Sequence, residues 1–97
     1  SARDKVTIVE AAQMNLSEAF NALLNERCSS AANEYHLSPR ETEVLGLLAR
    51  GRSLQAIADS LNVAYSTVKT HTDRIYAKMG VHSRQELIIL LEQSPKE

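Results

Sequence analysis

Apolar residues recur at three- and four-residue steps along most of this chain, which is the spacing of amphipathic helices. The pattern predicts five helices, over about residues 16–35, 39–49, 53–62, 65–79 and 84–92. Alternation of period two, which is typical of strands, is confined to the short stretch 6–9. We therefore expect an all-α fold.

Short polar residues mark where several of these helices begin. Asn15, Ser38 and Ser83 are each followed three residues later by glutamate, the spacing of a capping box. Ser38 is also followed by proline, which suits the first position of a helix. Gly51 and Gly80 follow the second and fourth helices and predict their C-terminal ends.

The third and fourth helices are separated only by residues 62–64. A connector this short forces a sharp crossing, as in a helix-turn-helix, whose second helix can enter a DNA major groove. On the fourth helix one side is predicted to be buried, and the opposite side carries short polar and charged groups. Such a side is by itself no more than a solvated surface, but the helix and turn before it favour a DNA-binding face. The predicted buried seam comprises Val68, Thr72, Ile75 and Met79.

The composition fits one small domain of 97 residues, of which 43% are hydrophobic and 24% charged. A net charge of −1 excludes a strongly basic protein that coats nucleic acid, but it conceals an uneven distribution. Between residues 65 and 84 four basic residues face a single acid, whereas acids outnumber bases in residues 1–36. The basic residues are therefore concentrated on the segment that would meet phosphate.

No chemistry of catalysis is apparent. The three histidines and the single cysteine, Cys28, have no metal-ligand spacing, and no nucleophile with a matching base stands out. We expect neither an enzyme nor a metal or other cofactor, and we interpret Cys28 as a small buried hydrophobe rather than a redox sensor. No apolar run is as long as a membrane span. Because the chain begins at Ser1 and not at Met, we expect it to be part of a longer protein.

The motifs SPRE, EVL, STVK and SRQEL occur in this order at positions 38, 43, 66 and 83. Through them the segment from about Leu37 to Leu91 resembles the DNA-binding domain of LuxR-type transcriptional regulators. The resemblance implies a four-helix helix-turn-helix domain over residues 37–93. An additional N-terminal helix and linker precede it in residues 1–36, and residues 94–97 form a tail. It also implies sequence-specific binding of double-stranded DNA by a cytoplasmic bacterial regulator, with RNA polymerase as a further candidate partner.

Carried over to this chain, Lys69 and Thr70 match positions of the family that face bases, and Thr67 and Lys69 match positions near phosphate. We add Asp73 to the predicted base contacts. The residues assigned to the DNA backbone are Ser66, Thr67, Arg74, Lys78, Ser83 and Arg84. His71 is interpreted as a packing and hydrogen-bonding residue.

Two positions depart from the family. The recognition helix is the second helix of the helix-turn-helix, predicted here over about residues 65–79. Ala64 stands where a Ser or Thr often caps this helix, so Ser66 or backbone contacts are left to cap it. Asp73 occupies a position that is basic in some members. Near phosphate its charge would cost affinity, but it can also accept from a cytosine amino group or pair with Lys69 one turn back. The DNA sequence that other family members recognise can therefore not be carried over to this chain.

The last helix carries apolar residues on too many sides for one core. The family pairs through this helix, so we expect a homodimer that contacts its second copy through Leu87, Ile89 and Leu90 and reads an inverted repeat. The first helix has a stripe of Phe20, Leu23 and Leu24. It can pair with another copy, fold back on the second helix, or be exchanged between copies.

Several alternatives remain open. Residues 1–36 resemble a juxtamembrane segment of LuxR-type regulators that are anchored in the inner membrane. Alternatively, a cytosolic sensor domain precedes this segment in the longer protein. A protein-interaction module of the same fold that has lost DNA binding is the competing function. A third is an oligomerisation arm, in which residues 1–36 would be the functional part.

Overall fold

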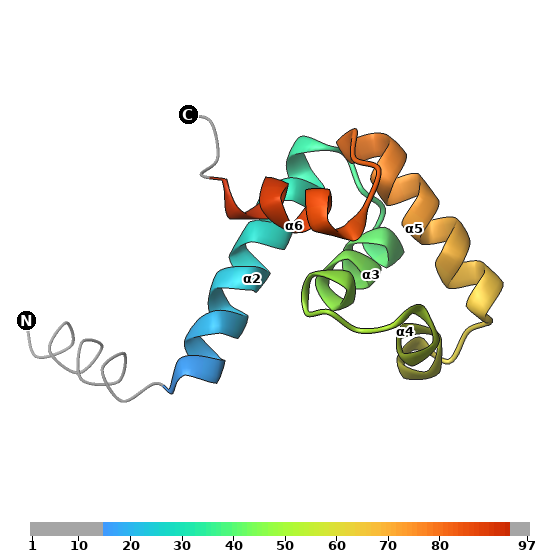
Figure 1. Cartoon of the computed structure of the whole chain (residues 1–97), viewed down its shortest axis with the longest axis horizontal. Coiled ribbons are helices and arrows are strands. Elements are labelled where there is room, and N and C mark those ends of the chain that lie inside the picture. The colour runs from blue at the N-terminus through green and yellow to red at the C-terminus, as the bar shows by residue number, and fades with distance from the viewer. Residues whose placement is uncertain (1–14, 94–97) are drawn as a thin grey trace, which may run out of the picture.

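The computed structural model describes residues 15–93, shown in Figure 1. Within that range there are only helices joined by short turns: α2 (Leu16–Glu34), α3 (Pro39–Ala49), α4 (Leu54–Leu61), α5 (Tyr65–Met79) and α6 (Arg84–Glu92). The predicted all-α fold is confirmed. The stretch 6–9, whose pattern alternates, lies outside the described residues.

Side-chain caps set the helix starts, as the sequence indicates. The Asn15 carboxamide oxygen accepts from the Glu18 N–H at 2.8 Å. At α3 the capping box is complete, because Ser38 Oγ accepts from the Glu41 N–H at 3.1 Å and Glu41 Oε1 accepts from the Ser38 N–H at 2.8 Å. Each such cap satisfies a backbone donor that the helix itself leaves without a partner.

The second predicted capping box, at α6, forms only in part. Ser83 Oγ accepts from the Glu86 N–H at 3.1 Å. The Glu86 carboxylate, however, lies 3.4 Å from the Ser83 hydroxyl and does not return to the Ser83 backbone N–H. The prediction of a reciprocal box here is therefore wrong, although Ser83 is the N-cap.

Residues in the left-handed conformation lie just after α2, α3, α4 and α5, and His36, with φ of +56°, is the one that follows α2. Gly51 and Gly80 have φ of +79° and +69°, a conformation that costs glycine nothing. Asn62, with φ of +55°, ends α4 in the same way. This reversal lets a connector of only three residues join α4 to α5.

Helix α3 lies at the centre and packs against α2, α4, α5 and α6. One continuous core results, and its largest fully buried side chains are Leu45, Leu48, Ile57, Ile75, Leu87, Val44 and Val68. The predicted seam of α5 is confirmed, since Val68, Thr72, Ile75 and Met79 are all buried. Leu87 corrects a prediction: it was expected at a dimer surface, but it is 0% exposed and belongs to the common core.

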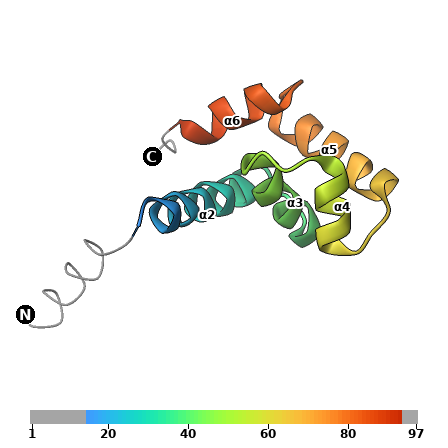
Figure 2. The same cartoon turned by 60° about the horizontal axis from the view of Figure 1, so that its bottom comes forward.

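The second half of helix α2 packs into the same core as the other helices. Cys28 and Ala31 join the common core, and the helix packs on α3 and α6 of the same chain. Of the alternatives considered for the first helix, the structure shows the one in which it folds back on the second helix. Residues on both sides of position 36 therefore share one core. The first half of α2 extends away from α4 and α5, as Figures 1 and 2 show, and Leu16 and Phe20 are exposed there.

Candidate nucleic-acid interface

The turn between α4 and α5 is held by backbone hydrogen bonds. The Val63 N–H donates to the Ala58 carbonyl at 3.0 Å, and Val63 itself is partly buried against the core. The hydrogen bond and the burial of Val63 hold this connector in place and so fix how α4 and α5 cross. Figure 1 shows α4 and α5 meeting at this turn, at the far end of the molecule from the start of α2.

The N-terminus of α5 has no side-chain cap. Ala64 takes the N-cap position with extended backbone, and no side chain accepts from the first turn. The Thr67 and Val68 N–H groups both bond to the Ala64 carbonyl, at 3.0 and 3.3 Å. Of the two expectations for this end, backbone contacts hold it and Ser66 does not. A helix N-terminus without a side-chain cap is suited to an anion such as a phosphate group.

The outer face of α5 is polar and exposed. Opposite the buried seam lie Ser66, Thr67, Thr70, Asp73, Arg74 and Ala77, all exposed. The Thr70 hydroxyl donates to the Ser66 carbonyl at 3.0 Å, which leaves its oxygen able to accept a hydrogen bond and its methyl group available for apolar contact. A face without a large apolar side chain is not built to pack on another helix.

Lys69 and Asp73 form an ion pair on this helix. Lys69 Nζ lies 2.9 Å from Asp73 Oδ1, and the two side chains are 56% and 61% exposed. The hydrogen bond to Asp73 and its negative charge raise the pKa of Lys69 above its ordinary value. Of the three roles considered for Asp73, pairing with Lys69 is the one that this structure contains.

Lys78 has an internal partner. Its ammonium lies 2.6 Å from Oε1 of Glu41, which is buried, and 3.3 Å from the His36 carbonyl oxygen. The last turn of α5 is therefore tied to the start of α3. A phosphate contact by Lys78, as predicted from the motif, would compete with this ion pair.

The start of α6 brings together two cationic residues that are 32 positions apart. The Arg84 guanidinium donates to the Arg52 carbonyl oxygen, which places Arg84 beside the turn between α3 and α4. Arg52 is exposed there and was not among the predicted DNA contacts. No sequence signal pointed to it, because its proximity to Arg84 depends on the packing of α6 on α3. Ser83, also predicted to hold the DNA backbone, uses its hydroxyl in the cap of α6.

The remaining predicted residues lie as follows. Ile89 is 50% exposed and Leu90 is partly buried, so Ile89 is the member of the predicted dimer set that faces outward most. His71 is half-buried, as its packing role requires. Its Nδ1 is buried and has no hydrogen-bond partner in residues 15–93, so the hydrogen bond expected of it does not form at that atom.

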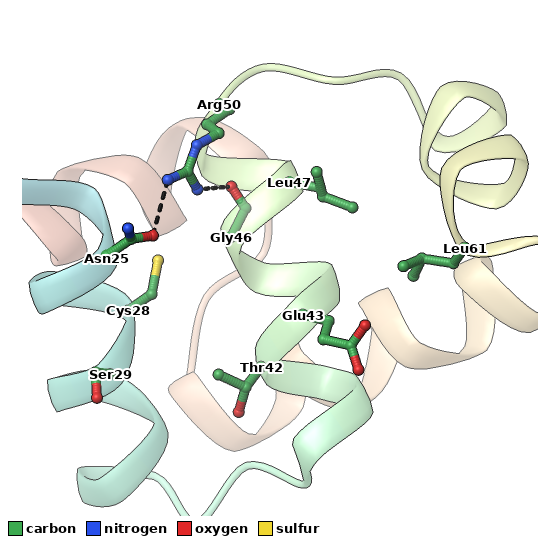
Figure 3. A pocket seen from close by; sticks show the side chains of 9 residues that line it. All are labelled: Asn25, Cys28, Ser29, Thr42, Glu43, Gly46, Leu47, Arg50 and Leu61. Carbon is green, nitrogen blue, oxygen red and sulfur yellow. Dashed lines mark hydrogen bonds between the residues drawn. The ribbon is translucent and has the colours of Figure 1, made fainter. Parts of the chain in front are cut away.

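A surface pocket of about 400 Å³ lies between α2 and α3, near the end of α4, and is drawn in Figure 3. Arg50 closes one side of it and donates to the Gly46 carbonyl at 2.8 Å and to Asn25 Oδ1 at 2.9 Å. Cys28 lines the pocket and is 5% exposed, and burial raises the pKa of its thiol. These contacts dock α2 on α3 and give Cys28 the packing role expected of it.

Two further observations concern the described part of the chain. No group of three or more His, Cys, Asp or Glu side chains in residues 15–93 gathers closely enough to hold a metal ion. None of the helices over these residues is both long and apolar enough to cross a membrane.

Known proteins resemble this chain in sequence. "Probable transcriptional regulatory protein NarL" of Mycobacterium tuberculosis is 58% identical over 48 residues, which cover 50% of this chain and 22% of that protein. "Fimbriae Z protein" of Escherichia coli is 38% identical over 93 residues, covering 88% of this chain and 44% of that protein. "HTH-type transcriptional regulator MalT" of Yersinia pestis is 48% identical over 52 residues, covering 54% and 6%. The chain thus spans less than half the length of these relatives, and no solved structure matches it significantly.

The family comparison covers the same helices that build the core and the outer face of α5. Residues 35–91, more than half of the chain, match the family described as "Bacterial regulatory proteins, luxR family". The match begins just after α2 and ends one residue before α6 does. The chain therefore belongs to the luxR family of bacterial regulatory proteins, and α3 to α6 are its helix-turn-helix domain, a DNA-binding module of transcription regulation.

Proposed function

We propose that this chain binds double-stranded DNA sequence-specifically, as the output domain of a bacterial transcriptional regulator, with α5 in the major groove. The observation that carries the proposal is the two-sided character of α5. Its seam of Val68, Thr72, Ile75 and Met79 is buried, while the opposite side presents small polar and charged groups and Ala77 to solvent, without a large apolar side chain. A major groove about 12 Å wide admits one helix with such a face.

The proposed contacts divide into two kinds. Lys69, Thr70 and Asp73 face the bases, and Ser66, Thr67 and Arg74 face the backbone along the same helix. Arg84 and its neighbour Arg52 add two cations at the turn between α3 and α4, where the start of α6 also lies. Lys78 is engaged with Glu41 and Ser83 with the α6 cap, so we give both a structural role in this proposal.

This division limits the number of phosphate contacts. Lys69 is paired with Asp73, which leaves Arg74, Arg84 and Arg52 as the principal cations for phosphate. Three neutralised phosphates per domain give an expected slope of log affinity against log salt of about −3, since each contributes about −0.9. A dimer bound to two half-sites should show about twice that slope.

We further propose that two copies pair through α6. Ile89 is half exposed and Leu90 lies beside it, partly buried, so an apolar patch remains on this helix after the core is filled. Two-fold pairing would place the recognition helices about 34 Å apart, one turn of DNA, on an inverted repeat. Leu87 takes no part, because it is enclosed in the core.

A selection from a randomised duplex pool at two salt concentrations tests the proposal. We expect enrichment of an inverted repeat that weakens with salt, and its loss in a variant carrying both Lys69→Ala and Thr70→Ala. Arg74→Ala should reduce affinity and the salt slope by about 1. Arg40→Ala removes the same charge from α3, where Arg40 pairs with Glu43 at 3.4 Å, and should leave binding unchanged. Folded protein that enriches no sequence and shows no salt-dependent binding would favour the protein-interaction module instead.

A further inference from the structure

The Lys69–Asp73 pair presents a hydrogen-bond donor and an acceptor side by side on the exposed face of α5. Nζ and Oδ1 are 2.9 Å apart, and more than half of each side chain is exposed. The ammonium has three N–H groups, of which Asp73 takes one, and the carboxylate keeps further acceptor sites. Both groups can therefore bind a partner at the same time without breaking their own hydrogen bond.

The major-groove edge of a G·C base pair has the complementary arrangement. Guanine O6 is an acceptor, and cytosine N4 carries a donor hydrogen that points into the groove. These two atoms are hydrogen-bonded to each other, so they lie about 2.9 Å apart. The spacing of donor and acceptor in the protein matches that of acceptor and donor in the base pair.

We propose that Lys69 and Asp73 act as one unit that reads a single G·C pair in each half-site. Lys69 Nζ donates to guanine O6 and N7, and the Asp73 carboxylate accepts from cytosine N4. This assignment rests on the proposed function and deepens it, because it names the base pair that the ion pair selects.

The edge of an A·T pair fits the ion pair less well. Adenine N6 would donate to Asp73, but the neighbouring N7 is an acceptor and repels a carboxylate. Thymine O4 would accept from Lys69, but the C5-methyl group beside it meets the ammonium. On guanine, by contrast, both O6 and N7 attract the ammonium.

The orientation of the base pair is selected as well. A reversed pair, C·G, would place the ammonium opposite the amino group and the carboxylate opposite O6, so that both contacts become repulsive. The direction of α5 fixes which member of the ion pair lies toward which strand. The unit therefore distinguishes G·C from all three other base pairs at one position.

Pairing also makes a carboxylate acceptable inside the groove. An unpaired Asp73 close to phosphates would lower affinity for every sequence, because like charges repel. With the Lys69 ammonium 2.9 Å away, that repulsion is largely offset before DNA arrives. Asp73 is thus placed to contribute to selectivity and not merely to weaken binding.

The test compares base preference in the wild-type chain and in Asp73→Asn, which keeps the shape and removes the charge. In a selection from a randomised pool, the wild-type chain should prefer G·C at one position of each half-site by about tenfold or more. Asp73→Asn should weaken that preference to what the Lys69 contact with guanine alone supplies, leaving the other positions as they were. The matched control is Asp59→Asn on α4, where the carboxylate accepts from Gln55 one turn away at 3.0 Å. It should leave the preference intact.

A second arm uses modified duplexes of the selected site. An inosine·C pair at that position retains the same major-groove edge as G·C and lacks only the minor-groove amino group, so wild-type affinity should persist. An A·T or C·G pair there should lower wild-type affinity by about tenfold or more, and the same exchange should cost Asp73→Asn less.

Each contrary result has its own meaning. If Asp73→Asn binds all sequences more tightly and keeps the same preference, Asp73 only repels phosphate, and the inference is overturned while the proposed function stands. If the affinity of the wild-type chain falls with inosine·C, the contact is in the minor groove and the inference is likewise wrong. If the folded wild-type chain shows no salt-dependent binding to any duplex, both the inference and the proposed function fail.

Discussion

Lys78 and Glu41 join the end of the recognition helix to the start of the central helix. Their Nζ and Oε1 atoms are 2.6 Å apart, although the residues are 37 positions apart in the chain. Glu41 also accepts from the Ser38 N–H and so completes the capping box of α3. A single buried carboxylate therefore serves both the start of one helix and the position of another.

We expect Lys78→Met to lower the free energy of unfolding by about 1–3 kcal/mol, because it leaves a buried carboxylate without its charged partner. Arg74→Met removes the same charge from the exposed face of α5 and should change stability by no more than about 0.5 kcal/mol. Urea unfolding of the three proteins measures both effects. Equal loss in the two variants would show that the Lys78 ion pair does not contribute to the fold.

The same carboxylate makes stability depend on pH. Burial alone would raise the pKa of Glu41, but the hydrogen bonds from Lys78 and Ser38 outweigh it, so the pKa lies below its ordinary value. A carboxyl group whose pKa is lower in the folded state stabilises the fold fully above its unfolded pKa of about 4.3. That contribution is lost as the pH falls through the lowered value.

The measurement is the difference in unfolding free energy between wild type and Glu41→Gln, taken from pH 7 down to pH 3. We expect a constant difference above about pH 5 that shrinks below it. A difference that grows as the pH falls would mean that the folded state holds the proton more tightly than the unfolded one.

The uncapped start of α5 can be stabilised. Ala64 already has the extended backbone of an N-cap, with φ of −70° and ψ of 150°. Ala64→Ser should therefore raise the free energy of unfolding by about 1 kcal/mol. Ser53→Ala removes the existing cap of α4, in which Ser53 Oγ accepts from the Ala56 N–H at 3.1 Å, and should cost a similar amount. If Ala64→Ser leaves the thermal midpoint where it was, the hydroxyl does not reach the first turn.

Leu87 and Ile89 lie on the same helix in opposite environments. Leu87 is 0% exposed, so Leu87→Ala should cost about 2–5 kcal/mol in unfolding free energy. Ile89 is 50% exposed, so Ile89→Ala should cost much less.

Ile89 also tests the proposed pairing through α6. Ile89→Glu should weaken binding to an inverted repeat far more than binding to one half-site, if two copies meet there. Glu92→Gln, which alters charge on an exposed residue of the same helix without touching the apolar patch, serves as the control. A loss of the same size on both DNA molecules would rule out pairing through Ile89.

Much of the fold is readable from local sequence because the deciding contacts span three or four residues. Asn15, Ser38 and Ser83 are the N-caps that the sequence predicts, although the reciprocal contact is absent at Ser83, and the apolar period of α5 marks its buried seam correctly. The Lys69–Asp73 pair was likewise among the expected arrangements, since residues one helical turn apart are neighbours on any helix. The short turn before α5 predicted the helix-turn-helix for the same local reason.

What the sequence by itself determined is therefore the set of helices, their ends, the polar face of α5 and, through its motifs, the family. The tertiary structure alone decided that Lys78 is held by Glu41, that Arg84 lies beside Arg52, that Leu87 is enclosed in the core, and that the second half of α2 packs on α3. These contacts join residues far apart in the chain. A repeat of 3.6 residues says which side of a helix is apolar, but the partner of that side, and of each charge beside it, is set by how the helices pack.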